Sequence, residues 1–166
     1  MAFGHYGGAL ASALLRLKYG NRPDLGPALG ELLCSVLPSH LAPGDVDVVI
    51  PIPVPYARLV ERGYNQAALI ARPVAAALAV PLDACALERK GGTVKQASLN
   101  RVDRLRNLRG AFSVRSRTNV RDKRVLLVDD VTTTGATLDA CTVLLEQTGA
   151  RSVRSLVVAR TESRGL

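Results

Sequence analysis

Residues 124–137 read RVLLVDDVTTTGAT, and this stretch decides the fold. An apolar run at 125–128 ends in two adjacent acids, Asp129 and Asp130, and a loop rich in hydroxyl residues follows. Apolar residues then recur at helical spacing over 137–147. A continuous apolar run bounded by turn residues predicts a strand that is buried on both faces. The order therefore predicts a strand, an acidic turn, a loop and a helix.

The loop between this strand and helix has the properties of a phosphate site. The first turn of a helix leaves backbone N–H groups without partners, and the helix dipole favours an anion there. Thr133, Thr134 and Thr137 add hydroxyl donors, and Gly135 lets the backbone approach a phosphate closely. The preceding acids suit the vicinal hydroxyls of a sugar, or a divalent metal between sugar and phosphate. This combination fits a phosphorylated ribose; the alternative is that the acids cap the helix and the threonines form an ordinary turn.

The stretch VLLVDDVTTTGAT resembles the signature of type I phosphoribosyltransferases, which bind phosphoribosyl pyrophosphate (PRPP). Thr132 departs from the pattern, because an aliphatic residue is commoner there. Further segments narrow the resemblance to the competence-protein ComF family of these enzymes. They are PIPVP at 51–55 with RGYNQ at 62–66, then Gln96, Leu99, Arg104 and Asn107 leading into GAF at 110–112, and Tyr6 with LKYG at 17–20. The resemblance covers nearly the whole chain, from about residue 6 to about residue 159.

The order of predicted elements indicates one α/β domain. Helices are predicted at 6–17, 23–37 and 65–79, the last with a kink or break at Pro73, and strands at 46–50, 82–87, 111–114, 125–128 and 153–158. Strands that alternate with helices favour a mostly parallel sheet covered on both faces, with ligands at the carboxyl ends of its strands. The resemblance implies a type I phosphoribosyltransferase-like sheet flanked by helices. We therefore expect a single domain over 1–166, with a small amino-terminal helical hood at 1–43, an α/β core at 46–159 and a flexible lid loop at 89–110.

Composition favours a protein without membrane insertion, expected in the cytoplasm. The chain has 166 residues, of which 48% are hydrophobic, and no apolar run reaches the length of a membrane span. Cys34, Cys85 and Cys141 are widely spaced, which argues against a disulfide framework or a zinc site and predicts small buried thiols. Members of the resembled family usually carry an amino-terminal cysteine zinc module. None precedes the transferase part here, and the sequence leaves open whether it was lost or lies outside this chain.

Positive charge is concentrated in one segment. The formal net charge is +8, and twelve basic residues but only two acidic ones lie between Arg89 and Arg124. Such a run is a solvated face, a site for pyrophosphate, or a nucleic-acid contact. No aromatic residue interrupts 89–110, so a platform for stacking bases is not expected there.

The resemblance implies a pyrophosphate site after the strand at 46–50. The rigid loop that contains Pro53 and Val54 would bind pyrophosphate, together with Arg58 and Arg62, whose guanidinium groups match phosphate oxygens. On composition alone, Arg58 is a solvated side chain and Arg62 belongs to a surface turn. Asn65 is an N-cap for the next helix at least as readily as a ligand contact.

The resemblance also implies a 5′-phosphate site, and Mg²⁺ as the cofactor. Asp129 and Asp130 would hold the ribose hydroxyls and would contact the metal only indirectly, through the substrate. With Lys95 and Arg104, both on the lid, these acids form the expected catalytic set. The expected 5′-phosphate residues are Thr133, Thr134, Gly135, Ala136 and Thr137. The alternative for the lid is a disordered basic loop without a catalytic part.

Three functions are compatible with these features. The first is transfer of the 5-phosphoribosyl group of PRPP to an acceptor, expected to be a nitrogenous base. The second is a non-catalytic PRPP-binding protein that acts in DNA uptake or competence through its basic surface, on DNA or on a partner of the competence machinery. The third is a purely structural α/β domain. The sequence leaves the acceptor and the oligomeric state open, a homodimer included.

Overall fold

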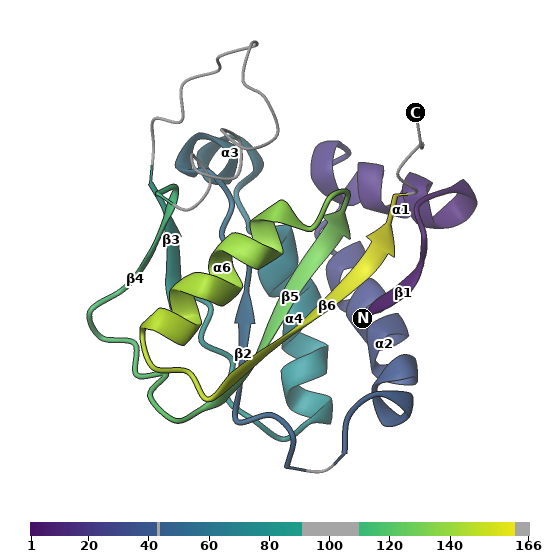
Figure 1. The fold of residues 1–166 in the computed structure, drawn as a ribbon. Helices are drawn as coiled ribbons and strands as arrows, with labels where there is room; N and C mark the ends of the chain where they lie inside the picture. Colours follow the sequence, from purple (N-terminus) through teal and green to yellow (C-terminus); the bar gives the residue numbers. More distant parts are fainter. Residues whose placement is uncertain (43, 91–109, 162–166) are drawn as a thin grey trace, which may run out of the picture.

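The main sheet is parallel and ends in a short amino-terminal strand. The computed structural model describes residues 1–42, 44–90 and 110–161. Four strands of this part pair in the order β1 (Ala2–His5), β6 (Ser152–Arg160), β5 (Arg124–Thr132) and β2 (Val48–Pro51) (Figure 1). All three pairings are parallel, and Leu82 adds a parallel bridge to Val49. The predicted mostly parallel α/β architecture is therefore confirmed.

The central strand β5 carries the stretch that decides the fold. Residues 125–128 are buried, as predicted for a strand covered on both faces. Leu126 and Val128 lie in one hydrophobic core, and Val125 and Leu127 lie in the other. The strand is longer than predicted, because β6 pairs with it as far as Thr132. The two acids therefore lie within the strand, and the prediction of an acidic turn was wrong.

Three helices pack on one face of the sheet. They are α1 (Gly8–Tyr19), α2 (Leu25–Val36) and α4 (Gln66–Ala77). The short 3-10 helix η1 (Leu37–Ser39) directly follows α2. Leu14 and Leu33, from α1 and α2, share the first core with Val128. The helices predicted at 6–17, 23–37 and 65–79 are thus confirmed with small shifts of their ends. Pro73 lies inside α4 without ending it.

The opposite face carries one long helix and a small second sheet. Figure 1 shows α6 (Ala136–Gln147) in front of the main sheet and α4 behind it. Beside α6, β3 (Leu87–Arg89) pairs antiparallel with β4 (Phe112–Val114). The strand predicted at 111–114 is observed as β4, but it pairs with β3 and not with the main sheet. The strand predicted at 82–87 is replaced by a single bridge at Leu82 and a turn, in which Asp83 accepts a hydrogen bond from the Cys85 N–H.

Strand β1 and helix α3 (Tyr56–Arg62) were not predicted. Strand β1 is short and mostly exposed, so its residues show no periodic signal. Helix α3 begins directly after Pro55 and ends at Gly63, whose φ of +80° is left-handed. Residues 52–55 form an irregular loop, as expected around Pro53 and Val54, and α3 follows this loop directly. A proline before the first turn does not interfere with a helix, since the N–H groups there have no intrahelical partner.

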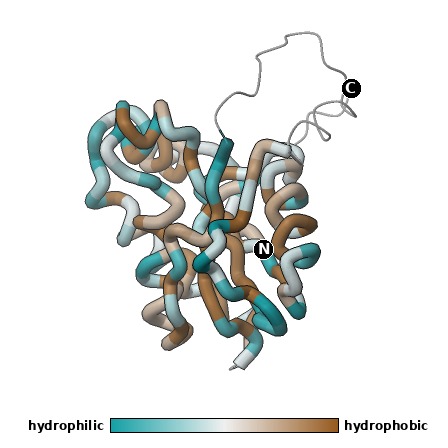
Figure 2. The backbone as a smooth tube through the Cα atoms, turned by 90° about the vertical axis from the view of Figure 1, so that its left-hand side faces the viewer, coloured by the Kyte–Doolittle hydropathy of each residue, from teal (hydrophilic) through white to brown (hydrophobic). Residues whose placement is uncertain are grey.

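Hydrophobic residues are distributed in short segments. Figure 2 shows hydrophobic stretches in strands and helices alternating with hydrophilic ones. In the described part of the chain, no helix combines the length and the apolar character needed to cross a membrane. Cys141 is buried and Cys34 is half-buried, but Cys85 is exposed, so the prediction of buried thiols was wrong for Cys85.

Candidate functional site

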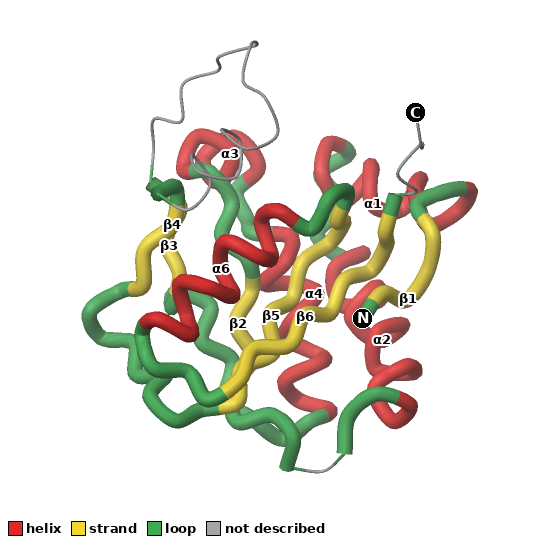
Figure 3. Tube along the Cα trace, viewed as in Figure 1, coloured by secondary structure: helices red, strands yellow, loops and turns green. Residues whose placement is uncertain are grey.

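The predicted site segments meet at one edge of the sheet. Strands β2, β5 and β6 run parallel, so their carboxyl ends lie at the same edge, where loops lead into α3 and α6 (Figure 3). Pro53 and Val54 follow β2, and the threonine-rich loop follows β5. The sequence placed both segments at strand ends, and the topology brings those ends together.

Asp130 is buried on the face that α1 covers. Its side chain is 4% exposed, and its Oδ2 lies 2.8 Å from the Nζ of Lys18, near the end of α1. Its Oδ1 accepts a hydrogen bond of 2.6 Å from the Val131 N–H. Beyond the Lys18 ion pair, Oδ2 has no hydrogen-bond partner within the described ranges. One oxygen of this carboxylate is thus buried near the carboxyl end of β5 and is held there by a lysine of α1.

Asp129 lies toward the other face of the sheet. Its Oδ1 accepts a hydrogen bond of 2.8 Å from the Asp130 N–H. Burial and, second, the neighbouring charge of Asp130 raise the pKa of Asp129 well above its ordinary value. Burial and then the charge of Asp129 also raise the pKa of Cys141, on α6, to about 12. Asp129 therefore favours its protonated form, whereas Asp130 is paired with a cation.

The threonine-rich loop ends at the amino terminus of α6. Gly135 immediately precedes the helix with a left-handed φ of +81°, a conformation that favours glycine. The Ala136 N–H donates to Thr134 Oγ1 over 3.4 Å. Since Thr133 and Thr134 are exposed, this end of α6 offers backbone N–H groups and hydroxyls to an anion.

Arg160 is a candidate site residue that the sequence did not reveal. It ends β6, where its Cα is in register with Thr132 of β5. A pocket of about 360 Å³ brings it together with Thr132, Thr134 and Gly135. The available signal was a charged residue directly after the apolar run of the last strand.

The loop after β2 is held to the core by Asn65. Its Oδ1 accepts a hydrogen bond of 3.0 Å from the Ala67 N–H, and its Nδ2 donates to the Ile52 carbonyl over 3.0 Å. The N-cap alternative for Asn65 is therefore confirmed. Pro53 and Val54 line a pocket of about 380 Å³ that reaches the small β3–β4 sheet.

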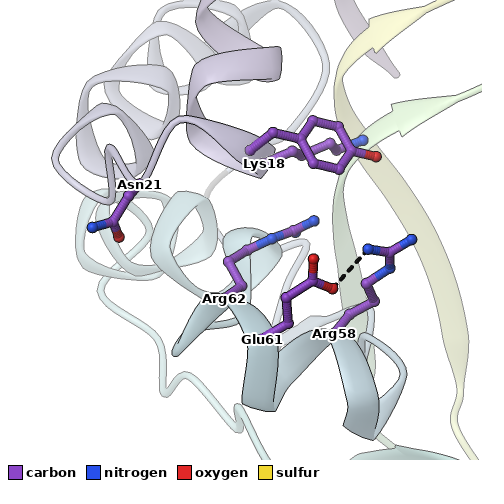
Figure 4. Close-up of a pocket in the computed structure, with 6 residues that line it drawn as sticks. Lys18, Asn21, Arg58, Glu61 and Arg62 are labelled. Carbon is purple, nitrogen blue, oxygen red and sulfur yellow. Dashed lines mark hydrogen bonds and ion pairs between the residues drawn. The ribbon is translucent and has the colours of Figure 1, made fainter.

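Helix α3 faces the carboxyl end of α1 across a further pocket (Figure 4). Arg58 forms a 2.7 Å ion pair with Glu61, and Arg62 donates a hydrogen bond to Gln66 Oε1. The Arg62 guanidinium also lies over the Tyr19 ring, 5.7 Å from its centroid. Figure 4 shows Arg58, Glu61 and Arg62 across from Lys18, which lies in the last turn of α1.

The hood contributes to this site in a way that the sequence did not reveal. Lys18 and Tyr19 belong to the LKYG segment at 17–20, which resembles the ComF family, but the resemblance assigned neither residue a role in the site. Tyr64 anchors this segment, because its hydroxyl donates a 2.6 Å hydrogen bond to the Leu17 carbonyl. The predicted lid residues Lys95 and Arg104 lie outside the described residues.

Comparison with known proteins decides the family. A model of the phosphoribosyl transferase domain family matches residues 64–166. The chain belongs to this family. It is 33% identical over 167 residues to Competence protein F of Haemophilus influenzae, covering 95% of this chain and 70% of that protein. DNA utilization protein YhgH of Escherichia coli (strain K12) is 32% identical over 159 residues, covering 94% of this chain and 69% of that protein.

A solved structure supports the phosphoribosyltransferase fold. Glutamine phosphoribosylpyrophosphate (PRPP) amidotransferase from B. subtilis, complexed with ADP and GMP, superposes with a TM-score of 0.58 at 22% identity. The match covers 87% of this chain and 30% of that one. The relatives named for competence and DNA utilization confirm the predicted kinship with the ComF group.

Proposed function

We propose that this phosphoribosyltransferase-family protein binds PRPP with Mg²⁺ and transfers the 5-phosphoribosyl group to an acceptor. The observation that carries the proposal is the end of β5, where two carboxylates with different environments stand directly before an anion-binding loop and the amino terminus of α6. A phosphorylated ribose needs both kinds of partner within one short distance.

Each part of the donor has a proposed partner at the sheet edge. The 5′-phosphate would accept hydrogen bonds from backbone N–H and hydroxyl groups of residues 133–137. Asp129 and Asp130 would hold the ribose hydroxyls. The loop at Pro53 and Val54 would take the pyrophosphate with a cation of the following helix, for which the sequence predicted Arg58 and Arg62.

The chain fits a magnesium ion that arrives with the substrate. Within residues 1–42, 44–90 and 110–161, no three acidic, histidine or cysteine side chains gather where they could hold a metal ion. Mg²⁺ is commonly bound through one or two carboxylates together with substrate phosphates. Bound there, the ion would neutralise charge on the departing pyrophosphate. Asp129 and Asp130 would orient the ribose hydroxyls that contact it.

The acids would divide the chemistry between them. The bond from the ribose C1 to the pyrophosphate oxygen breaks, and a bond from C1 to a nitrogen of the acceptor forms. Burial and the charge of Asp130 raise the pKa of Asp129, so its ionised form, once it has lost its own proton, would take up the acceptor's proton as the base. Asp130 is suited to hold a hydroxyl, since Lys18 fixes its carboxylate. We further propose Lys95 and Arg104, from the segment with the sequence resemblance, as partners of the leaving group.

The names of the relatives favour a second candidate function. Competence protein F and DNA utilization protein YhgH suggest that the bound donor serves as a signal in DNA handling. In that case PRPP is bound but not consumed. Strongly salt-dependent binding of DNA would support this function.

Titration calorimetry and a pyrophosphate-release assay separate the two. PRPP is titrated with Mg²⁺ and then with excess EDTA, and release is followed against a panel of bases. The proposal predicts Mg²⁺-dependent binding and release with at least one base. Binding without release against any base would favour the signalling function, and no binding at all would overturn both. The Gly135→Val variant tests the role of the loop. A branched side chain at φ +81° is strained and should weaken PRPP binding.

A further inference from the structure

The pocket between the end of α1 and helix α3 has a charge imbalance. It has a volume of about 260 Å³ and opens between two segments that are far apart in sequence (Figure 4). Its lining consists of Lys18, Tyr19, Asn21, Arg58, Glu61 and Arg62. Three of these side chains are cationic and one is anionic.

Two of the three cations already have an acidic partner. Lys18 is paired with Asp130, and Arg58 is paired with Glu61. These two charges are therefore largely compensated before any ligand binds. They shape the wall of the pocket more than they attract an anion.

Arg62 is different, because its observed partners are neutral. Its guanidinium donates to the amide oxygen of Gln66 and lies over the Tyr19 ring. Over the ranges that the structure describes, no carboxylate is paired with it. The two neutral contacts orient the planar group and leave its charge uncompensated. A half-buried, oriented guanidinium is the group that best matches a carboxylate or a phosphate.

The location of the pocket indicates which ligand would bring the anion. Lys18 lines the pocket and also contacts Asp130, so a ligand here lies one side chain from the acid proposed to hold the ribose. Pro53 and Val54, proposed for pyrophosphate, line a different pocket. The pocket between α1 and α3, which Arg58 also lines, is instead built from the end of α1 and the facing side of α3.

We propose that this pocket is an anion subsite that binds a carboxylate or phosphate group of the acceptor, with Arg62 as its central contact. The proposal rests on the proposed function, and it assigns Arg62 to the acceptor and not to pyrophosphate. The acceptor class is then an acidic nitrogenous compound. A neutral base would leave the guanidinium without a partner.

Matched pairs of bases test this proposal. Nicotinate against nicotinamide, and orotate against uracil, are titrated into the free protein and into the protein with PRPP and Mg²⁺. Pyrophosphate release is the readout where turnover occurs. We expect at least one acid to bind or react roughly tenfold or more better than its neutral partner. Arg62→Gln should remove this preference, and Arg62→Lys should retain part of it.

Controls separate a local effect from loss of folding. Arg151→Gln removes the same charge from an exposed position at the start of β6, and should leave the preference unchanged. Arg58→Gln should have a smaller effect than Arg62→Gln, because Glu61 already compensates Arg58. Unfolding midpoints of all variants are measured alongside.

The outcomes distinguish the possible sources of the anion. No preference for any acid over its neutral partner, including no binding of either, would overturn the subsite. An Arg62→Gln variant could instead lose affinity for PRPP or for inorganic pyrophosphate and keep the preference for acids. That result would show that Arg62 binds the pyrophosphate of the donor and would overturn the subsite. If the wild type prefers acids but fails to bind PRPP, the proposed function falls and the anion site stands.

Discussion

Asp129 and Asp130 are neighbours in β5, yet they enter different environments. Asp130 lies on the side of α1, where the Lys18 ammonium is 2.8 Å away. Asp129 lies on the side of α6, where burial and the adjacent negative charge raise its pKa. Successive side chains of a strand point to opposite faces of the sheet, so adjacent acids sample two separate surroundings.

The difference teaches that the acidic pair is not one chelating unit. Two carboxylates that lie in different surroundings are suited to different tasks. Asp130, with Lys18 as a fixed cationic partner, can accept a hydrogen bond from a hydroxyl. Asp129 can exchange a proton near neutral pH. The charge of Lys18 acts on both acids, but of the two only Asp130 forms an ion pair with it, and this contact from α1 creates the asymmetry.

The largest expected effect comes from removing the compensated acid. Asp130→Asn should weaken Mg²⁺-dependent PRPP binding by about a hundredfold, because an amide replaces a charged acceptor and Lys18 loses its partner. Calorimetric titration measures the change. Asp122→Asn removes the same charge at an exposed turn and should bind normally. Unchanged PRPP affinity in Asp130→Asn would mean that the two acids do not differ as described.

The second prediction concerns the lysine that creates the asymmetry. Lys18→Met should lower the free energy of unfolding by about 2 kcal/mol, because a buried carboxylate loses its ion-pair partner. Urea unfolding at neutral pH measures it. The double variant Lys18→Met, Asp130→Asn should recover at least half of the loss, since no buried charge is then left unpaired.

Arg16→Met is the matched control for this cycle. Arg16 is an exposed cation on the same helix, and its removal should change the free energy of unfolding by less than about 0.5 kcal/mol. A double variant as unstable as Lys18→Met alone would show that Lys18 acts through packing and not through the ion pair.

Helices α2 and α4 pack more closely on each other than β1 packs on α1. A Cβ atom at Gly30 of α2 would lie 2.4 Å from the Ile70 carbonyl oxygen of α4, and backbone cannot yield there. Gly30→Ala should therefore destabilise the protein by about 2 kcal/mol in urea unfolding. At Gly4 the nearest atom to such a Cβ is 3.5 Å away, so Gly4→Ala should be nearly neutral. Equal effects of the two substitutions would contradict the close contact of α2 and α4.

Local sequence patterns predicted the part of the site that is continuous in the chain. The apolar run and the acids of β5, the glycine of the loop and the periodicity of α6 all act within a few residues of each other. Each of these features follows from backbone sterics and helix-end chemistry. The core of the fold was predictable for the same reason.

Contacts between distant segments were not predictable in this way. The Lys18–Asp130 pair joins residues from opposite ends of the chain, and nothing around Lys18 indicates a buried acid as its partner. The β3–β4 pairing was missed because two short strands carry no signal for which strand they join. The left-handed Gly63 ends α3, and α4 begins three residues after it, at Gln66. The proline-rich stretch before α3 masked that helix.

The smallest expected effect is the pH dependence that Asp129 confers. In the unfolded chain its pKa is about 4, and folding raises it. The folded state therefore binds the proton more tightly, so this contribution to stability is fully present below pH ~4 and is lost as the pH rises through the folded pKa. In the Asp129→Asn variant, the side chain at position 129 carries no charge at any pH. The variant should be more stable than the wild type by about 1 kcal/mol at pH 8, and the difference should shrink toward pH 4.

Urea unfolding across this range measures the difference, with Asp122→Asn expected to follow the wild type. A constant difference between Asp129→Asn and the wild type from pH 4 to 8 would show that Asp129 does not hold a proton in the folded protein, and the two acids would then be equivalent.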